Sequence, residues 1–269
     1  MTRTALIAGE GLLPRIDAAA LDDTQIHALT GVTPDIPARP FRLEQLVPFL
    51  DRLVDDGIER VVFAGAVRRP RLDPEAFDPR TAQLVPRILS AMQSGDDAAL
   101  RTVLELFEEH GLNICGINDI CPDIVPGAGV LVGQVGEADR RDAARAAEIL
   151  TATGPLDLGQ GAVVAQGLCL AIETLPGTAA MLDFVARHQD LRPDANGGKG
   201  VLYKAPKPDQ DRRIDLPALG PDSVSQAAAA GLAGIAWEAN GVILLERPEM
   251  ERRAAAAGIF LWSRDVENG

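Results

Sequence analysis

The chain has 269 residues, of which 46% are hydrophobic, and a net charge of −13. This length accommodates two modest domains, and the acidic balance excludes a general nucleic-acid groove, which needs a concentrated basic face. An acidic surface likewise has no general attraction for anionic lipid headgroups, so any basic site must be local.

Neither a secretory signal nor a membrane span is predicted. The opening run MTRTALIAGEGLLP is too short an apolar stretch for a signal, and nowhere are there about twenty consecutive apolar residues. The three cysteines form no CxxC pair and are expected to be buried thiols in a reducing compartment. The three histidines lack the spacing of a helical zinc pair. We therefore expect a cytoplasmic protein without a histidine-rich metal centre.

The first half of the chain shows the pattern of a parallel α/β fold. Residues 4–8 are an apolar run that ends in a glycine turn, which predicts a first strand. Residues 43–54 repeat apolar side chains at helical spacing, and the apolar run 60–64 follows as a buried strand. A further amphipathic helix is expected between residues 96 and 111. A helix followed by an apolar strand is typical of a βαβ unit.

The second half is also predicted to be mixed α/β. Residues 122–136 are rich in Pro and Gly and are expected to connect the halves, although the run VLVGQV within them has the character of a strand. Helices are predicted over 137–153, 177–188, 223–230 and 248–257, and strands over GAVVAQG, LCLAIE, VLYKA, the surroundings of Ile235, 242–245 and IFLW. We expect an N-terminal domain over 1–132 and a C-terminal domain over 133–269.

Two glycine-containing segments of the first half are candidate sites. Gly9–Pro14 lies between a strand and a helix, where backbone N–H groups approach phosphates. Pro14 stands where the dinucleotide fingerprint has a glycine, which weakens the hypothesis of a nicotinamide-dependent oxidoreductase. That hypothesis rests on this loop alone. A tight turn without a ligand is an equal alternative. Arg68 and Arg69 follow the strand 60–64 and are either phosphate ligands or solvated loop charges.

Two segments of the second half are also candidates. In Asp157–Gly161 the glycines indicate close backbone approach, while Asp157 is an N-cap or turn residue in the competing interpretation. The segment 203–217 is the richest, because Pro206 and Pro208 fix its backbone and it concentrates cations in an acidic chain, among them Lys204, Lys207 and Arg213. Asp215 lies in Ile-Asp-Leu-Pro, where a carboxylate needs a partner or a cation. Cations with such a carboxylate suit the cleavage of a phosphoanhydride, and a surface loop of salt bridges is the alternative.

These segments, in this order, resemble the LpxI family of UDP-2,3-diacylglucosamine pyrophosphatases of lipid A biosynthesis in Gram-negative bacteria. The resemblance begins with LIAGEGLLP and continues through FAGAVRRP and GDDAALRTVLELFEEHG. It is densest from LDLGQGAVV onward, through KAPKPDQDRRIDLPALGPDSV, AAAAGLAGIAWEANG and AAGIFLW. A collinear set of this length is more specific than any one of its motifs.

The resemblance implies an N-terminal Rossmann-like domain and a C-terminal mixed α/β domain, with the lipid-linked UDP-sugar in a cleft between them. It implies attack of water on the diphosphate with Mg²⁺ or another divalent metal, releasing UMP and 2,3-diacylglucosamine 1-phosphate. The essential aspartate of the family falls on Asp215, which is our candidate catalytic residue and metal ligand. The candidate substrate-binding residues are Gly9, Gly11, Arg69, Gln160, Thr178, Lys204, Lys207, Gln210 and Arg213.

The partners are expected from the resemblance together with the acidic charge, which argues against a nucleic-acid partner. We expect a homodimer, no nucleic-acid partner, and transient contact with the cytoplasmic face of the inner membrane, where the diacylated substrate resides.

The sequence departs from the family pattern around the start of the predicted helix 177–188. Pro176 and Ala179 stand where the family usually has carboxylates, and Glu10 stands in the first loop where glycine is common. These departures leave open a second class of function, a nucleotide-sugar or lipid-binding protein of the same fold without hydrolysis.

Overall fold

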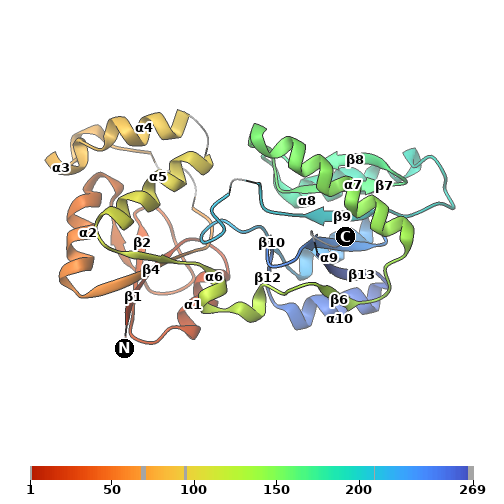
Figure 1. Ribbon diagram of the computed structural model, residues 1–269, viewed down its shortest axis with the longest axis horizontal. Coiled ribbons are helices and arrows are strands. Elements are labelled where there is room, and N and C mark those ends of the chain that lie inside the picture. Colours follow the sequence, from red (N-terminus) through yellow and green to blue (C-terminus); the bar gives the residue numbers. More distant parts are fainter. Residues whose placement is uncertain (1, 68–70, 94–95, 209, 266–269) are drawn as a thin grey trace. The chain divides into compact units, whose positions relative to one another are not determined.

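The computed structural model describes residues 2–67, 71–93, 96–208 and 210–265. They form two compact units, an N-terminal unit that ends at Pro122 and a C-terminal unit that begins at Asp123 (Figure 1).

The division lies earlier in the chain than the expected boundary after residue 132. The segment β6 (Gly129–Val132) pairs antiparallel with the last strand, β13 (Phe260–Arg264). The strand character expected of the run VLVGQV is confirmed for residues 130–132. These residues belong to the sheet of the C-terminal unit, whereas the expected boundary after residue 132 assigns them to the N-terminal domain.

The N-terminal unit contains a five-stranded parallel sheet in the order β3-β2-β1-β4-β5. Its strands are β1 (Arg3–Ala8), β2 (Thr24–Leu29), β3 (Arg39–Phe41), β4 (Ile58–Ala64) and β5 (Asn113–Cys115). Because β1 lies between β2 and β4, the chain builds the sheet first to one side and then to the other. This doubly wound order confirms the Rossmann-like α/β prediction.

Helices cover both faces of this sheet (Figure 1). They are α1 (Leu13–Ala20), α2 (Leu46–Asp55), α3 (Pro79–Ala82), α4 (Val85–Gln93), α5 (Asp96–Glu109) and α6 (Ile117–Ile120), with 3-10 turns η1 (Leu43–Gln45) and η2 (Pro74–Ala76). Leu6 and Val62 pack toward α1 and α6, whereas Phe63 points the other way and meets Phe107 of α5, with ring centroids 5.1 Å apart. Successive side chains of a strand alternate between faces, so both faces are apolar.

The C-terminal unit contains a six-stranded mixed sheet in the order β6-β13-β11-β9-β7-β8. Its remaining strands are β7 (Gly161–Ala165), β8 (Leu168–Ile172), β9 (Val201–Lys204) and β11 (Gly234–Glu238), and β10 (Ala218–Leu219) pairs separately with β12 (Ile243–Leu244). The three central strands β9, β11 and β13 are parallel to one another, while β7 and β8 form the predicted antiparallel hairpin.

Helices also cover both faces of the second sheet. They are α7 (Glu137–Thr153), α8 (Gly177–Arg187), α9 (Pro221–Ala229) and α10 (Arg247–Ala257), with 3-10 turns η3 (Pro122–Ile124), η4 (Gly154–Leu156) and η5 (Gln189–Leu191). Ala146 of α7 packs with Tyr203 on one face, and Leu182 of α8 packs with Leu202 and Trp237 on the other. All four residues of β9 are consequently buried.

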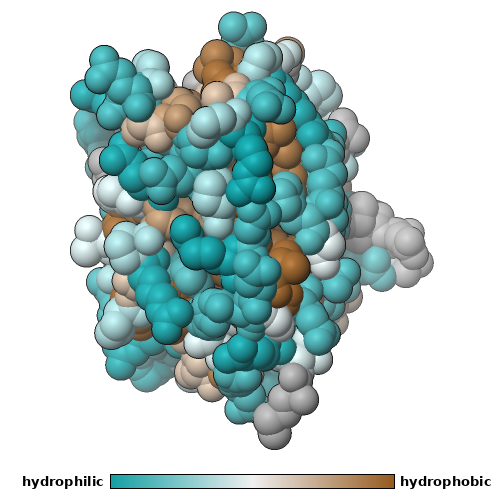
Figure 2. Space-filling view, turned by 90° about the vertical axis from the view of Figure 1, so that its left-hand side faces the viewer, coloured by the Kyte–Doolittle hydropathy of each residue, from teal (hydrophilic) through white to brown (hydrophobic). Residues whose placement is uncertain are grey.

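The surface is mostly polar on the face that can be seen in one view. The face drawn in Figure 2 is largely hydrophilic, with apolar residues in small separate patches. Across the described ranges, each helix is too short or too polar to traverse a bilayer. The expectation of three buried thiols is wrong, because Cys169 on the outermost strand β8 is exposed and Cys115 and Cys121 are half-buried.

Candidate active site in the C-terminal unit

Several candidate residues meet at one edge of the C-terminal sheet. The strand β9 ends at Lys204, and β7 runs antiparallel to it, so that Gly161 at the start of β7 lies opposite Lys204. The neighbouring strand β8 ends at the same edge, where Glu173 follows it. The carboxyl ends of parallel strands are the usual ligand-binding edge of an α/β sheet. This edge therefore combines the two candidate segments of the second half.

Lys204 is buried in a small polar network. Its side chain points to the same face of the sheet as Leu202, which is the face that α8 covers. The ammonium nitrogen Nζ donates a hydrogen bond of 2.8 Å to Thr178 Oγ1, and Thr178 Oγ1 donates one of 2.5 Å to Glu173 Oε1. Burial lowers the pKa of Lys204, and the Glu173 carboxylate, with Oε2 3.5 Å from Nζ, opposes that shift.

The glycines of the segment Asp157–Gly161 make room for Glu173. A Cβ atom on Gly159 would lie 2.5 Å from the carbonyl oxygen of Glu173, and one on Gly161 would lie 2.8 Å from Glu173 Oε2. The predicted close backbone approach is thus an approach to Glu173. Asp157 has the turn role of the competing interpretation, because its φ of +53° places it in a left-handed turn.

Asp215 is held by a second network built from two glutamines. The amide nitrogen Nε2 of Gln210 donates to Asp215 Oδ2. Gln210 Oε1 in turn accepts from Gln160 Nε2 and, at 2.9 Å, from the backbone N–H of Lys207. Gln210 is buried and Asp215 half-buried. Because both ends of the Gln210 amide are engaged, the direction in which it presents the Asp215 carboxylate is fixed.

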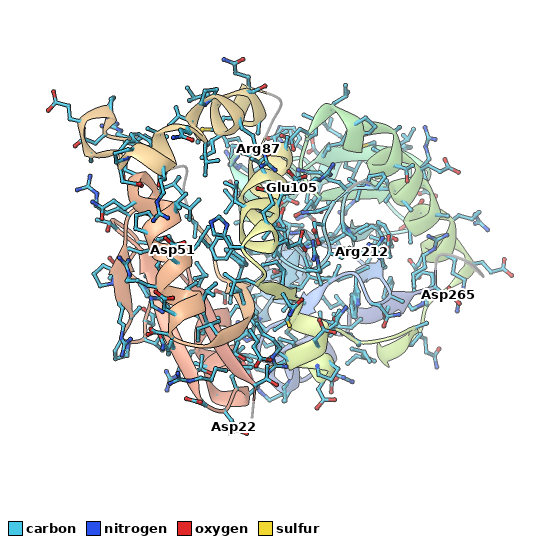
Figure 3. The ribbon with its side chains drawn as sticks, turned by 60° about the vertical axis from the view of Figure 1, so that its left-hand side comes forward. Asp22, Asp51, Arg87, Glu105, Arg212 and Asp265 are labelled. Atoms are coloured by element: carbon cyan, nitrogen blue, oxygen red, sulfur yellow. The ribbon has the colours of Figure 1, made fainter. Side chains whose placement is uncertain are left out.

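The remaining basic residues of this edge have carboxylate partners. Lys207 Nζ lies 2.5 Å from Asp157 Oδ1, and the guanidinium of Arg213 donates to both oxygens of Asp211, at 3.0 and 2.7 Å. Outside the predicted set, Arg212 (Figure 3) forms a 2.6 Å ion pair with Glu238 at the end of β11. An anionic ligand would have to share these cations with carboxylates or displace the carboxylates from them.

The glycine loop lies in the N-terminal unit and is largely engaged with the loop after β4. Gly9 N–H donates to the carbonyl oxygen of Ala64 at 2.7 Å, and a Cβ atom on Gly9 would lie 2.6 Å from backbone atoms of Gly65 and Ala66. Gly11 differs, because it has φ +96° and no atom near the place of a Cβ. Close packing of the two loops explains why a glycine stands at position 9. The positive φ of the turn explains the glycine at position 11. The predicted ligand Arg69 lies outside the described residues.

The structure thus assembles seven of the predicted residues at one edge; these are Gln160, Thr178, Lys204, Lys207, Gln210, Arg213 and Asp215. Sequence reasoning missed Glu173. Its signal was a single carboxylate directly after the apolar run LCLAI, at the end of a strand.

A divalent ion would have few protein ligands here. Within the described ranges, His, Cys, Asp and Glu side chains form no group of three that could hold a metal. Mg²⁺ is commonly bound through one or two carboxylates together with substrate phosphates and water. Asp215, a carboxylate held in place by a neutral amide, fits that mode.

Comparisons with known proteins point to the same family over nearly the whole chain. The profile of the LpxI N-terminal domain matches residues 3–124, and that of the LpxI C-terminal domain matches residues 127–262. A protein of Caulobacter vibrioides named UDP-2,3-diacylglucosamine pyrophosphatase LpxI is 35% identical, with 99% of each chain covered.

Proposed function

The chain belongs to the LpxI family, and from this premise we propose that it hydrolyses UDP-2,3-diacylglucosamine to UMP and 2,3-diacylglucosamine 1-phosphate. The observation that carries the proposal is the Asp215 carboxylate, which Gln210 orients through an amide that also accepts from the backbone N–H of Lys207, in a chain similar over 99% of its length to a protein with that name.

The reaction is a hydrolysis of a phosphoanhydride. The oxygen of a water molecule forms a bond to one phosphorus while one of its O–H bonds breaks and the proton passes to solvent. The bridging P–O bond breaks, and the leaving phosphate keeps the electron pair. Asp215 acts on the attacking water by accepting its hydrogen bond and aligning it. Gln210 contributes by holding the carboxylate, since its amide is fixed from the other side by Gln160.

The diphosphate carries negative charge that the site must balance. Lys204, Lys207 and Arg213 are the cations that we assign to its oxygens, and the ammonium or guanidinium groups stabilise the charge that grows on the leaving phosphate. A divalent ion held by Asp215, for which Mg²⁺ is our proposal, would supply further polarisation of the phosphoryl oxygens.

The non-hydrolytic alternative rests on the loss of carboxylates at Pro176 and Ala179. Both positions are exposed at the start of α8, whose first turn carries no acidic residue. A carboxylate there would stabilise the helix N-terminus. Carboxylates at these exposed positions would thus serve the helix, so their loss does not by itself argue against hydrolysis.

The test is the release of UMP from UDP-2,3-diacylglucosamine by the purified protein, with Mg²⁺ and with EDTA. We expect metal-dependent release that falls roughly hundredfold or more in Asp215→Ala, because a group that aligns the water acts mainly in the transition state. Asp222→Ala, which removes an exposed carboxylate of α9, is the matched control. Substrate retained without any release by the wild type would favour the binding protein.

Access to a diacylated substrate requires contact with lipid. We propose that the protein works in the cytoplasm and touches the inner face of the inner membrane transiently. Co-sedimentation with lipid vesicles that contain the substrate checks this contact, and analytical ultracentrifugation checks the expected homodimer.

A further inference from the structure

We propose that Glu173 is a positioning residue of this site, which holds the ammonium group of Lys204 at the ligand-binding edge both through Thr178 and directly. The inference rests on the proposed function, because it assigns Lys204 the task of meeting the diphosphate. It also makes Thr178, a candidate substrate-binding residue in the sequence, the link between the two charged groups.

The count of hydrogen-bond donors supports this assignment. A threonine hydroxyl has one proton, and Thr178 donates it to Glu173 Oε1. The hydroxyl oxygen then accepts from Lys204 Nζ, so both functions of the hydroxyl are in use. An ammonium group has three N–H donors, and the hydrogen bond to Thr178 uses one of them. Lys204 therefore retains donors for a ligand, whereas Thr178 has none.

The carboxylate of Glu173 also maintains the charge of Lys204. Lys204 is 5% exposed, and burial alone favours loss of its proton. Among the described residues of the strands and helix that pack on this side chain, Glu173 is the group whose negative charge acts on Lys204 in the opposite direction. Removing that charge should release the proton of Lys204 at lower pH.

The surrounding backbone fixes Glu173 rather than leaving it mobile. Its N–H donates to the carbonyl oxygen of Gly161 at 2.7 Å, and its carbonyl oxygen accepts from the N–H of Gly159 at 3.1 Å. The buried oxygen Oε2 has no hydrogen-bond partner among the described residues, so its interaction with Lys204 is an ion pair at 3.5 Å. A buried carboxylate held in this way is suited to orienting the ammonium group of Lys204 and less suited to exchanging a proton with a ligand.

A direct test uses the lysine content of the chain, which has three lysines: Lys199, Lys204 and Lys207. Protein labelled with ¹³C at the lysine side chains gives three resolvable signals, whose assignment follows from single Lys→Arg variants. In Glu173→Gln, we expect the pKa of Lys204 to fall by about one unit or more, because the nearest opposite charge is lost. Glu148→Gln, which neutralises an exposed carboxylate of α7, should leave it unchanged.

Turnover supplies the second readout. In Glu173→Gln the alkaline limb of the kcat/KM profile should move to lower pH, and kcat/KM at pH 8 should fall about tenfold or more. Thr178→Val keeps the shape of the side chain but removes the link, so it should lower kcat/KM, while Thr178→Ser should preserve it. These two variants test the link even when Glu173→Gln fails to fold.

The outcomes separate this inference from the proposed function. An unchanged Lys204 titration in folded Glu173→Gln overturns the positioning role, whatever the activity. An active wild type with equal kcat/KM in Thr178→Val and Thr178→Ser overturns the link through Thr178. Absence of UMP release by the wild type overturns the proposed function, and the lysine titration still decides the role of Glu173.

Discussion

Asp17 of α1 is an ionisable residue in an unfavourable place. Its side chain is fully buried in the N-terminal unit, and among the described residues neither carboxylate oxygen has a hydrogen-bond partner of ordinary geometry. Burial raises the pKa of Asp17 from its usual value of 3.8 to about 7, although the Cys121 thiol pulls it back in part. The folded protein therefore takes up a proton that the unfolded chain does not hold near neutral pH.

This burial predicts a pH dependence of stability. Because the pKa is higher in the folded state, the free energy of unfolding should fall as pH rises from about 4 to about 7 and then level off. A shift of about three units corresponds to at most roughly 4 kcal/mol. In Asp17→Asn this part of the dependence should vanish, as measured by urea unfolding at pH 5 and pH 8. Asp22→Asn, at an exposed position nearby (Figure 3), is the control, and equal slopes in all three proteins would contradict the prediction.

At the residue scale, the candidate site residues that the sequence indicates are those that share one chain segment. Lys204, Lys207 and Asp215 are close in sequence, and their alternation of charge with proline is visible without a structure. Glu173 is visible in the sequence as a carboxylate at the end of a strand, but its contacts could not be predicted, because its partners come from α8 and β9. Only the pairing of β7 with both β8 and β9 brings these elements to one edge.

At the scale of elements, periodic patterns located the long helices and the apolar strands. The helix 137–153 has the predicted bounds, because its alternating charged and alanine-rich positions leave one stripe for the sheet. The strand β2 (Thr24–Leu29) was not predicted, since Gln25 and His27 interrupt its apolar pattern. His27 is nevertheless buried against the ring of Phe49, a contact between segments that are distant in sequence.

The two glycines of the first loop should respond differently to alanine. Gly9→Ala places a Cβ atom 2.6 Å from the backbone of the loop after β4, so that loop must move; we expect a loss of about 2–3 kcal/mol. Gly11→Ala meets no neighbouring atom and has only the positive φ against it, for about 1 kcal/mol. Urea unfolding of the two variants measures both effects, and a larger loss in Gly11→Ala would refute the crowding argument.

At the scale of the whole molecule, each unit has a sheet with helices on both faces. The C-terminal unit contains its own apolar cores on the two sides of β9. Such a unit is expected to fold alone when its boundary respects strand pairing. The sequence predicts two α/β units, and the structure has two. The position of the division depends on the pairing of β6 with β13, which no local pattern reveals.

Two truncated proteins test this boundary. Residues 123–269 should give a cooperative thermal transition and dispersed NMR signals, because β6 is retained. Residues 133–269 lack β6 and leave one edge of β13 unpaired, which favours aggregation and lowers the transition temperature. Equal behaviour of the two proteins would show that β6 contributes little to this unit.

The pairing of Lys207, Arg213 and Arg212 with carboxylates has a consequence for the kinetics of association. A cluster of unpaired cations would draw an anion in from a distance, and salt would slow its capture. Here the cations are neutralised locally, and the chain as a whole is acidic, so a free nucleotide such as UMP approaches against a weak repulsion. Its association rate in stopped-flow measurements should then stay level or rise as ionic strength increases, because salt screens that repulsion.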